Sequence, residues 1–246
     1  MNVHCLGGGG YYATDDTHTV CFMIPELGII IDAGSGLFRA IDLVKTDDIH
    51  LFLTHAHSDH TCGLAYLNLF YKKTNVKNIY IHASEFTLST INNIYKPPLI
   101  GSPLKFHPVA FQNEEKVITL ANGTIVRRFP VNHSIECYGY RFENGSHTLG
   151  FITDTSSDEN SEYLENIVGV NFLIHECYLP SGSDEKARAS GHTSSLGLLG
   201  FCKKAGISKV WLMHHNPSGN REKILSEVKK EVHGAESAID KAFHDF

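Results

Sequence analysis

The chain has 246 residues, of which 42% are hydrophobic and 20% charged, a composition typical of a globular protein with a substantial core. Its 27 acidic residues outnumber its 21 Lys and Arg residues, and the formal net charge of −6 argues against tight binding of long nucleic acids by phosphate neutralisation. The six cysteines form no C-x-x-C pair, and the first residues, MNVHCLGGGG, do not resemble a signal peptide. These features predict a single domain over residues 1–246, located in the cytoplasm, with no membrane-spanning segment.

The first half of the chain alternates short apolar strands with amphipathic segments. The predicted strands cover residues 19–24, 27–32, 49–54 and 77–83. Apolar residues at helical spacing predict helices over 36–45, 61–73 and 84–95. Three prolines within 95–103 predict a loop.

The second half is richer in strands. The predicted strands cover residues 105–111, 115–120, 124–131, 137–143, 148–154, 170–176 and 207–213. The turn ENGSH at 143–147 predicts a hairpin between two of them. Helices are predicted over 158–168, 192–206 and from Pro217 to the end of the chain, with a polar loop at 180–191.

The order of these elements predicts the fold class. Helices flank β-rich segments in each half, and no internal repeat or low-complexity linker divides the chain. This pattern predicts an α/β protein, an αββα sandwich of two mixed β-sheets flanked by helices.

The stretch HAHSDH at 55–60 follows the apolar strand IHLFLT. Residues two apart in an extended segment project to the same side, so His55 and His57 can bind one ion. Asp59 and His60 follow where the chain turns into a helix, and they point towards a second position. Neutral imidazole is a good zinc ligand and a carboxylate adds charge compensation, so the stretch outlines a two-ion site.

Three further candidate ligands each stand where an apolar strand stops. His133 follows TIVRRFPVN, Asp154 ends TLGFIT, and His214 ends ISKVWLM. The carboxylate of Asp154 could bridge two cations. A single histidine at a strand end is usually structural, but three such residues beside H-x-H-x-D-H are hard to dismiss as coincidence.

These motifs together resemble the metallo-β-lactamase fold hydrolases, and within them the branch that holds ribonuclease Z and related phosphodiesterases. The resemblance extends over nearly the whole chain. The matching segments are LGGGG (6–10), IIIDAGSG (29–36), LTHAHSDHTCGL (53–64), VNHS (131–134), FITDT (151–155), LIHECYL (173–179), GHTSS (191–195) and WLMHHNP (211–217).

The resemblance implies two divalent cations, Zn²⁺ first, with Mn²⁺ or Fe²⁺ as alternatives. One ion would be held by His55, His57 and His133, and the other by Asp59, His60 and His214, with Asp154 bridging both. The resemblance favours His214 over His215, because the ligand is the first residue after the strand.

Other residues acquire roles from the same resemblance. His192 of GHTSS matches a histidine that contacts the substrate phosphate or the leaving group, and it begins a helix, where backbone N–H groups favour an anion. His175 and Glu176 match a pair in which the glutamate orients that histidine. Asp32 matches a buried carboxylate that fixes the metal loop. A purely structural role, such as helix capping by His192 and Thr193, is the alternative.

The implied activity is hydrolysis of a small or cyclic phosphodiester by a hydroxide that bridges the metals, with Asp59 orienting the hydroxide and His192 assisting the departing oxygen. RNA is the alternative substrate, in a ribonuclease Z-like tRNA 3′-processing endonuclease. However, the interval between His133 and Asp154 holds only two strands and a turn, without the long arm that many such enzymes carry for tRNA. Hydrolysis of a lactone or thioester, and a non-catalytic nucleotide-sensing module, also stay open. The resemblance further allows a homodimer.

Overall fold

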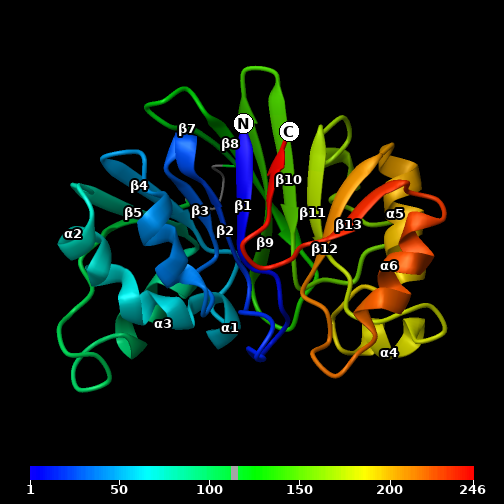
Figure 1. Cartoon of the computed structure of the whole chain (residues 1–246), viewed down its shortest axis with the longest axis horizontal. Coiled ribbons are helices and arrows are strands. Elements are labelled where there is room, and N and C mark those ends of the chain that lie inside the picture. Colours follow the sequence, from blue (N-terminus) through cyan, green and yellow to red (C-terminus); the bar gives the residue numbers. More distant parts are fainter. Residues whose placement is uncertain (112–115) are drawn as a thin grey trace. The chain divides into compact units, whose positions relative to one another are not determined.

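A computed structural model of the chain describes residues 1–111 and 116–246, which form two compact units (Figure 1). The first unit runs from Met1 to Glu115 and includes Ile239–Asp245, and the second contains Lys116–Ala238 and Phe246. Each unit is built on one seven-stranded sheet. The single domain over residues 1–246 stays a prediction, and Glu115, the first residue of the predicted strand 115–120, lies outside the described residues.

The sheet of the first unit is mixed. Its strands lie in the order β14 (Phe243–Asp245), β1 (Asn2–Gly7), β2 (Cys21–Ile24), β3 (Ile29–Ile31), β4 (Asp48–Phe52), β5 (Asn78–Ala83) and β6 (His107–Ala110). The strands β3 to β6 are parallel neighbours, whereas β14, β1, β2 and β3 pair antiparallel. Parallel strands end at the same edge, so the loop after β4 begins at the edge where β3 and β5 also end.

Short helices cover one face of this sheet. They are η1 (Pro25–Leu27), η2 (Leu37–Leu43), α1 (Ser58–Thr61), η3 (Cys62–Leu69), α2 (Phe70–Lys73) and α3 (Glu85–Ile94). Alternate residues of β4, such as Ile49 and Leu51, pack into one apolar core with Leu64 and Phe70. In place of the single helix predicted over 61–73, the structure has the three short helices α1, η3 and α2, and the first of them begins at Ser58. At Gly63 this segment approaches the loop after β3 so closely that an added Cβ would lie 2.2 Å from the backbone oxygen of Gly34.

The sheet of the second unit is also mixed. Its strands lie in the order β13 (Gly234–Ser237), β12 (Lys209–Met213), β11 (Phe172–Glu176), β10 (His147–Ile152), β9 (Cys137–Asn144), β8 (Ile125–Val131) and β7 (Val117–Thr119). The strands β10 to β13 are parallel, and β7 to β10 pair antiparallel. The predicted hairpin is present as β9 and β10, joined by a tight turn in which Gly145 has φ of 60°.

The helices of the second unit are η4 (Leu164–Asn166), α4 (Asp184–Ala189), α5 (Ser195–Ala205) and α6 (Arg221–Lys229). Helix α5 has clear ends, because the Ser194 side chain caps its first turn and Gly206, with φ of 70°, ends its last. Apolar residues of α5, including Leu198 and Phe201, join the core beneath β10, β11 and β12.

Two sequence predictions in the second unit are wrong for local reasons. The helix over 158–168 reduces to the single turn η4, because Asp158 and Ser161 side chains bond to nearby backbone N–H groups and stabilise turns instead. The polar loop at 180–191 contains the helix α4, in which acidic residues occupy the first turn and basic residues the last.

The chain ends were also predicted incorrectly. The segment after Pro217 is helical only in α6, and it then forms β13 and β14. Strand β13 pairs with β12, and β14 pairs with β1, a strand that the sequence patterns did not predict. Both C-terminal strands are short, and β14 depends on a partner at the opposite end of the chain. Among the described residues, none of the helices has the length and apolar character needed to cross a membrane.

Candidate metal centre

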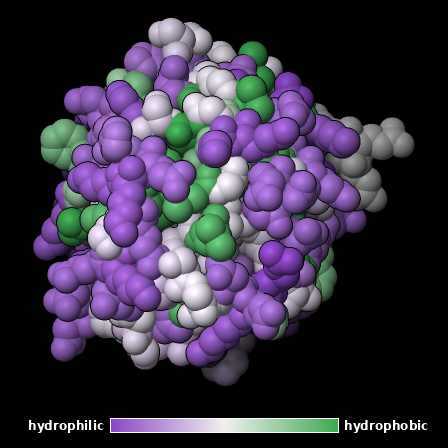
Figure 2. Space-filling view, turned by 90° about the vertical axis from the view of Figure 1, so that its right-hand side faces the viewer, coloured by the Kyte–Doolittle hydropathy of each residue, from purple (hydrophilic) through white to green (hydrophobic). Residues whose placement is uncertain are grey.

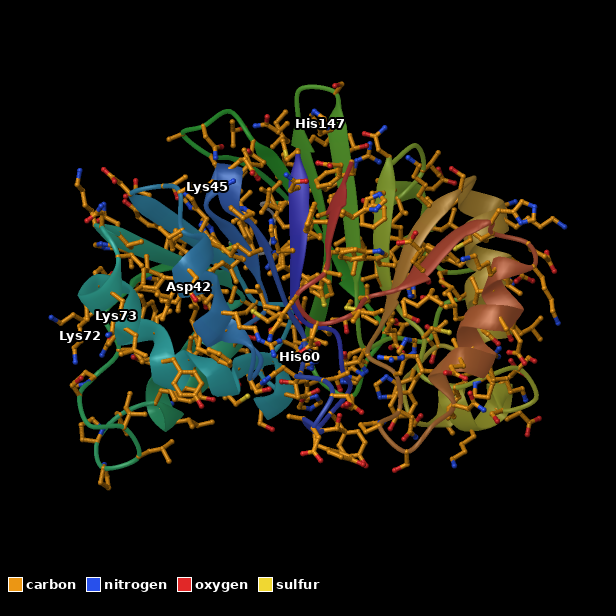
Figure 3. All side chains as sticks on the ribbon, viewed as in Figure 1. Asp42, Lys45, His60, Lys72, Lys73 and His147 are labelled. Carbon is orange, nitrogen blue, oxygen red and sulfur yellow. The ribbon has the colours of Figure 1, made fainter. Side chains whose placement is uncertain are left out.

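The first unit contributes the donors of HAHSDH, which we call the first half-site (His55, His57, Asp59 and His60). The chain leaves β4, continues extended through His57 and enters α1, so the four side chains come from one tight bend. His55, Asp59 and His60 are buried and His57 is half-buried. Figure 3 shows His60 at the end of this unit where α1 lies, whereas Lys45 lies towards the opposite end.

Asp32, in the loop after β3, organises this bend. Its carboxylate accepts hydrogen bonds from the backbone N–H of Thr54 at 2.8 Å and from its hydroxyl at 2.9 Å. It also lies 2.7 Å from Nδ1 of His60. Burial raises the pKa of the Asp32 carboxyl, and the interactions with His60 and Thr54 oppose that shift. The contacts fix the ring of His60, as expected for a carboxylate behind a metal-binding histidine.

These contacts also determine which ring nitrogens carry protons. If Nδ1 of His60 donates to Asp32, its Nε2 presents a lone pair, and that atom lies 3.2 Å from Oδ2 of Asp59. The Thr54 hydroxyl donates to Asp32 and can therefore accept from Nδ1 of His55 at 3.0 Å, which leaves Nε2 of His55 as an acceptor. That atom lies 3.0 Å from Nδ1 of His57. Such close groups of lone pairs suit a cation.

The second half-site, in the second unit, is assembled from separate strands: His133 follows β8, Asp154 follows β10 and His214 follows β12. The two carboxylate oxygens of Asp154 face different imidazoles. Its Oδ2 lies 3.6 Å from Nε2 of His133, and its Oδ1 lies 3.3 Å from Nε2 of His214. A carboxylate held in this way can contact two ions at once.

His192 stands beside this half-site, two residues before Ser194, the N-cap of α5. The Glu176 carboxylate, at the end of β11, accepts from Nδ1 of His192 at 3.0 Å and from the backbone N–H groups of Thr155 and Thr193. The ring of His192 lies 5.2 Å from the ring of His214, and the ligand atoms of Glu176, His192 and His214 all lie within 4.8 Å of one another. The carboxylate therefore orients His192 and can stabilise its protonated form.

Two residues near the site were missed by sequence reasoning. Tyr178 stacks on the ring of His192 at a centroid distance of 4.2 Å; it lies in the matching segment LIHECYL, but no residue pattern there assigned it a role. Thr54, which connects Asp32 to His55, could have been found as the hydroxyl residue immediately before H-x-H. Gly191 permits close packing as well, because an added Cβ would lie 3.2 Å from Nδ1 of His133.

Two other histidines near the site have different contacts. Nδ1 of His175 donates to the carbonyl of Glu176, and Ser157 donates to its Nε2. Both ring nitrogens are therefore bonded to groups other than His192 and Asp154. Nδ1 of His215 donates to the carbonyl of Cys177 at 2.8 Å. Burial lowers the pKa of both to about 4, so both are neutral at pH 7. His214, not His215, faces Asp154.

The backbone at three of these positions is unusual. Asp32, Asp154 and His214 have φ of 57°, 48° and 52°, and only one other non-glycine residue in the described ranges, Lys241, has a positive φ. Such left-handed backbone costs energy for residues other than glycine and gathers at functional sites. All three residues lie within two positions of the end of a strand.

Comparison with known families defines the class of protein. A sequence profile of the beta-lactamase superfamily domain matches residues 28–215, and the chain therefore belongs to this superfamily. It has the metallo-β-lactamase fold, and its matches include ribonuclease Z and tRNase Z, members of the branch that the sequence motifs resemble. The predicted αββα class is confirmed, since two mixed seven-stranded sheets flanked by helices match that fold.

Individual relatives agree with this assignment. The chain is 25% identical to YhfI of Bacillus subtilis (strain 168), described as a probable metallo-hydrolase, over 95% of both chains. The crystal structure of YhfI superposes with a TM-score of 0.82, at 19% identity over 99% of this chain and 98% of that one. Ribonuclease Z of Methanothermobacter thermautotrophicus is 21% identical over 87% of this chain and 86% of its own.

A more distant structure belongs to a diphosphatase from the PhnP family. It superposes with a TM-score of 0.72 at 21% identity and covers 100% of this chain and 97% of its own. Together with the His and Asp clusters of each unit, these matches support a metal-dependent hydrolase.

Proposed function

We propose that the two half-sites face a common pair of divalent cations and that the protein hydrolyses a small or cyclic phosphodiester. One ion would be bound by His55, His57 and His133, and the other by Asp59, His60 and His214. Asp154 would bridge both ions. The observation that carries the proposal is the position of Asp154, whose two oxygens face two different imidazoles.

The donor set fits Zn²⁺. Imidazole nitrogens and carboxylate oxygens are the ligands that zinc takes in hydrolytic sites, and Mn²⁺ or Fe²⁺ would accept the same set. The contacts of Asp32 and Thr54 favour a lone pair on Nε2 of both His55 and His60, the protonation state that metal binding needs. Two cations would also compensate the three carboxylates that Asp32, Asp59 and Asp154 place in buried positions.

Bound cations of this kind lower the pKa of water and neutralise charge on phosphate oxygens. The protein residues would do the rest. Asp59 would orient the attacking water, and Asp154 would fix the separation of the two metal positions. His192 would deliver a proton from Nε2 to the departing oxygen, while the Glu176 carboxylate, 3.0 Å from Nδ1, stabilises the positive charge on the ring.

Phosphodiester chemistry is favoured by His192 and its carboxylate, which supply an acid for a poor leaving group. The tight β9–β10 hairpin between His133 and Asp154 and the net charge of −6 favour a small substrate over RNA. The relatives described above include a ribonuclease and a diphosphatase, and both names denote cleavage at phosphorus.

The test combines metal analysis with a substrate screen. We expect purified protein to contain about two equivalents of metal by mass spectrometry and to hydrolyse bis(p-nitrophenyl) phosphate, with activity lost on chelation and restored by Zn²⁺ or Mn²⁺. Lactones and thioesters should react far more slowly. Metal-free protein after expression in metal-supplemented medium, or preferential turnover of a lactone or thioester, would contradict the proposal.

A further inference from the structure

A groove of about 560 Å³ opens in the second unit beside His192. Its walls are the loop 156–160, the residues Asp184 and Arg188 of α4, and the face of α5 from Ser194 to Lys203. We call it the α5 groove. Its volume lies within the range of small-molecule sites and suits a group the size of a nucleoside. The side of the molecule that carries α5 and α6 is mostly hydrophilic, with small apolar areas between polar side chains (Figure 2).

The loop 156–160 and helix α5, which form two walls of the α5 groove, contact each other at several points. An added Cβ at Gly197 would lie 2.4 Å from the backbone oxygen of Ser157, and one at Gly200 would lie 2.4 Å from Oε2 of Glu159. The backbone N–H of Ser157 also donates to the hydroxyl of Thr193 at 2.9 Å. The loop is therefore held against α5, and the groove exists before any ligand binds.

The charges of the α5 groove are unbalanced. Its lining includes four carboxylates against two permanently cationic side chains and the ring of His192: Asp158, Glu159, Asp184 and Glu231, with Arg188 and Lys203. Arg188 lies 3.8 Å from Asp158, so of the two permanent cations in the lining only Lys203 is left to offset the other three carboxylates. A polyanion placed here would meet like charges.

The remaining lining suits a neutral organic group. The hydroxyl of Ser156 and the amide of Asn160 can form hydrogen bonds with hydroxyl groups of a ligand. Leu199 and the 57% exposed Leu196 offer an apolar surface on the helix side. A planar base with an attached sugar has this combination of an apolar face and polar edges.

We propose that the α5 groove binds the leaving group of the substrate, that this group is an uncharged alcohol of nucleoside size, and that the groove carboxylates exclude a polyanionic leaving group such as an RNA chain. The inference rests on the proposed function. In the hydrolysis, water releases one proton to solvent as its oxygen bonds to phosphorus, the bond from phosphorus to the alcohol oxygen breaks, and that oxygen takes a proton from His192, which then regains one from solvent. Because His192 lines the groove, the carbon skeleton attached to that oxygen extends along α5.

The first experiment compares two dinucleotides under the same conditions. Adenylyl-adenosine releases a neutral nucleoside, whereas the same dinucleotide with a phosphate at both ends releases a charged fragment whichever ester bond breaks. We expect kcat/KM for the neutral form to be about tenfold higher or more, since like-charge contacts penalise the wrong partner. Equal rates, or a preference for the doubly phosphorylated form, would overturn the inference while leaving the phosphodiesterase proposal intact.

A charge-reversal pair makes that comparison specific. The double variant Glu159→Lys/Glu231→Lys should reduce the preference to about threefold or less, and the effect should fade at high salt. The matched control Glu162→Lys/Glu165→Lys makes the same change in net charge at exposed residues outside the α5 groove. The control should retain the wild-type preference, and an equal effect in both variants would refute a local role of the groove.

A binding measurement gives a readout that does not depend on turnover. With the metal-loaded protein, adenosine alone should shift the methyl resonances of Leu196 and Leu199. Asn160→Trp, which fills the α5 groove, should abolish those shifts, whereas the control variant Glu162→Lys/Glu165→Lys, outside the groove, should retain them. Absence of hydrolysis with intact adenosine shifts would reject the phosphodiesterase proposal but not the groove as a nucleoside site. Absence of shifts in the wild type would reject the groove.

Discussion

The two half-sites are built in contrasting ways. The first takes four donors from six consecutive residues, and one buried carboxylate, Asp32, aligns the bend through Thr54 and His60. The second takes its donors from the ends of β8, β10 and β12, and its supporting carboxylate, Glu176, aligns His192 instead of a strand-end donor. The comparison suggests a division of labour, in which the first half-site mainly holds metal and the second also carries the proton that leaves with the product.

The largest expected effect comes from the carboxylate whose oxygens face two imidazoles. Asp154→Asn keeps a residue that tolerates positive φ but removes the negative charge. We expect bound metal to fall below one equivalent and kcat/KM to drop by about 10³-fold or more, because several kcal/mol of metal-derived stabilisation are lost. Asp59→Asn, which affects one proposed ion only, should retain about one equivalent. Equal metal content in the two variants would contradict the bridging role.

The second-largest expected effect concerns the proton that His192 would give to the leaving group. His192→Ala should lower kcat by about 10²–10⁴-fold for substrates with alkyl alcohol leaving groups. With p-nitrophenolate, a good leaving group that needs little protonation, the loss should be much smaller, and metal content should not change. The exposed His233→Ala serves as the control. A uniform loss across leaving groups would assign His192 to phosphate binding instead of proton transfer.

The supporting carboxylates should separate the two half-sites more directly. Asp32→Asn should weaken metal binding by about 10–100-fold, because it no longer orients His60. Glu176→Gln should leave metal binding nearly unchanged and lower kcat by a similar factor, with the alkaline limb of the pH–rate profile displaced to lower pH because His192 must be protonated to act as the acid. The measurements are metal titration and pH-dependent kinetics. Loss of metal in Glu176→Gln would abolish the distinction between the half-sites.

The smallest expected effect lies in the first unit, at a contact of 2.9 Å between His50 and His82. Burial, with a smaller contribution from His50, lowers the pKa of His82 to about 3, and burial lowers that of His50. In the unfolded chain these two histidines bind protons below about pH 6.5, whereas in the folded chain their lowered pKa opposes protonation. The free energy of unfolding should therefore fall as pH decreases from 6.5 towards 3.

His82→Phe should remove much of this loss of stability, which amounts to about 1–2 kcal/mol in the free energy of unfolding at pH 5. His107→Phe, at an exposed histidine of β6, provides the control. The measurement is the free energy of unfolding between pH 5 and 8, and identical pH dependence in wild type and His82→Phe would contradict the assignment.

The donors of the two half-sites are easier to recognise in the sequence than several elements of the fold around them. The residues His55 to His60 are contiguous, and His133, Asp154 and His214 each follow an apolar strand, so pattern and chemistry coincide in the sequence. Tyr178 could not be found in this way, because its stacking on His192 depends on how two loops meet. Similarly, β14 is stabilised by pairing with β1, and a three-residue polar strand has no periodicity of its own.

The helical prediction over 158–168 failed for a related reason. Tyr163, Leu164 and Ile167 are buried at a spacing that a helix would also produce. The preceding polar residues instead form side-chain-to-backbone bonds, and such local competition is invisible to a hydrophobic pattern. Residues 158–160, which form a loop instead of the predicted helix, also line one wall of the α5 groove.

The left-handed backbone at Asp32, Asp154 and His214 limits how this chemistry could be transplanted. A designer who copied only the side chains onto ordinary strand ends would aim them at the faces of the sheet, and valine, isoleucine or threonine at these three positions would be penalised before any reaction was attempted. The portable unit is the kinked main chain together with its residue, so the motif letters alone would not carry the activity into a new scaffold.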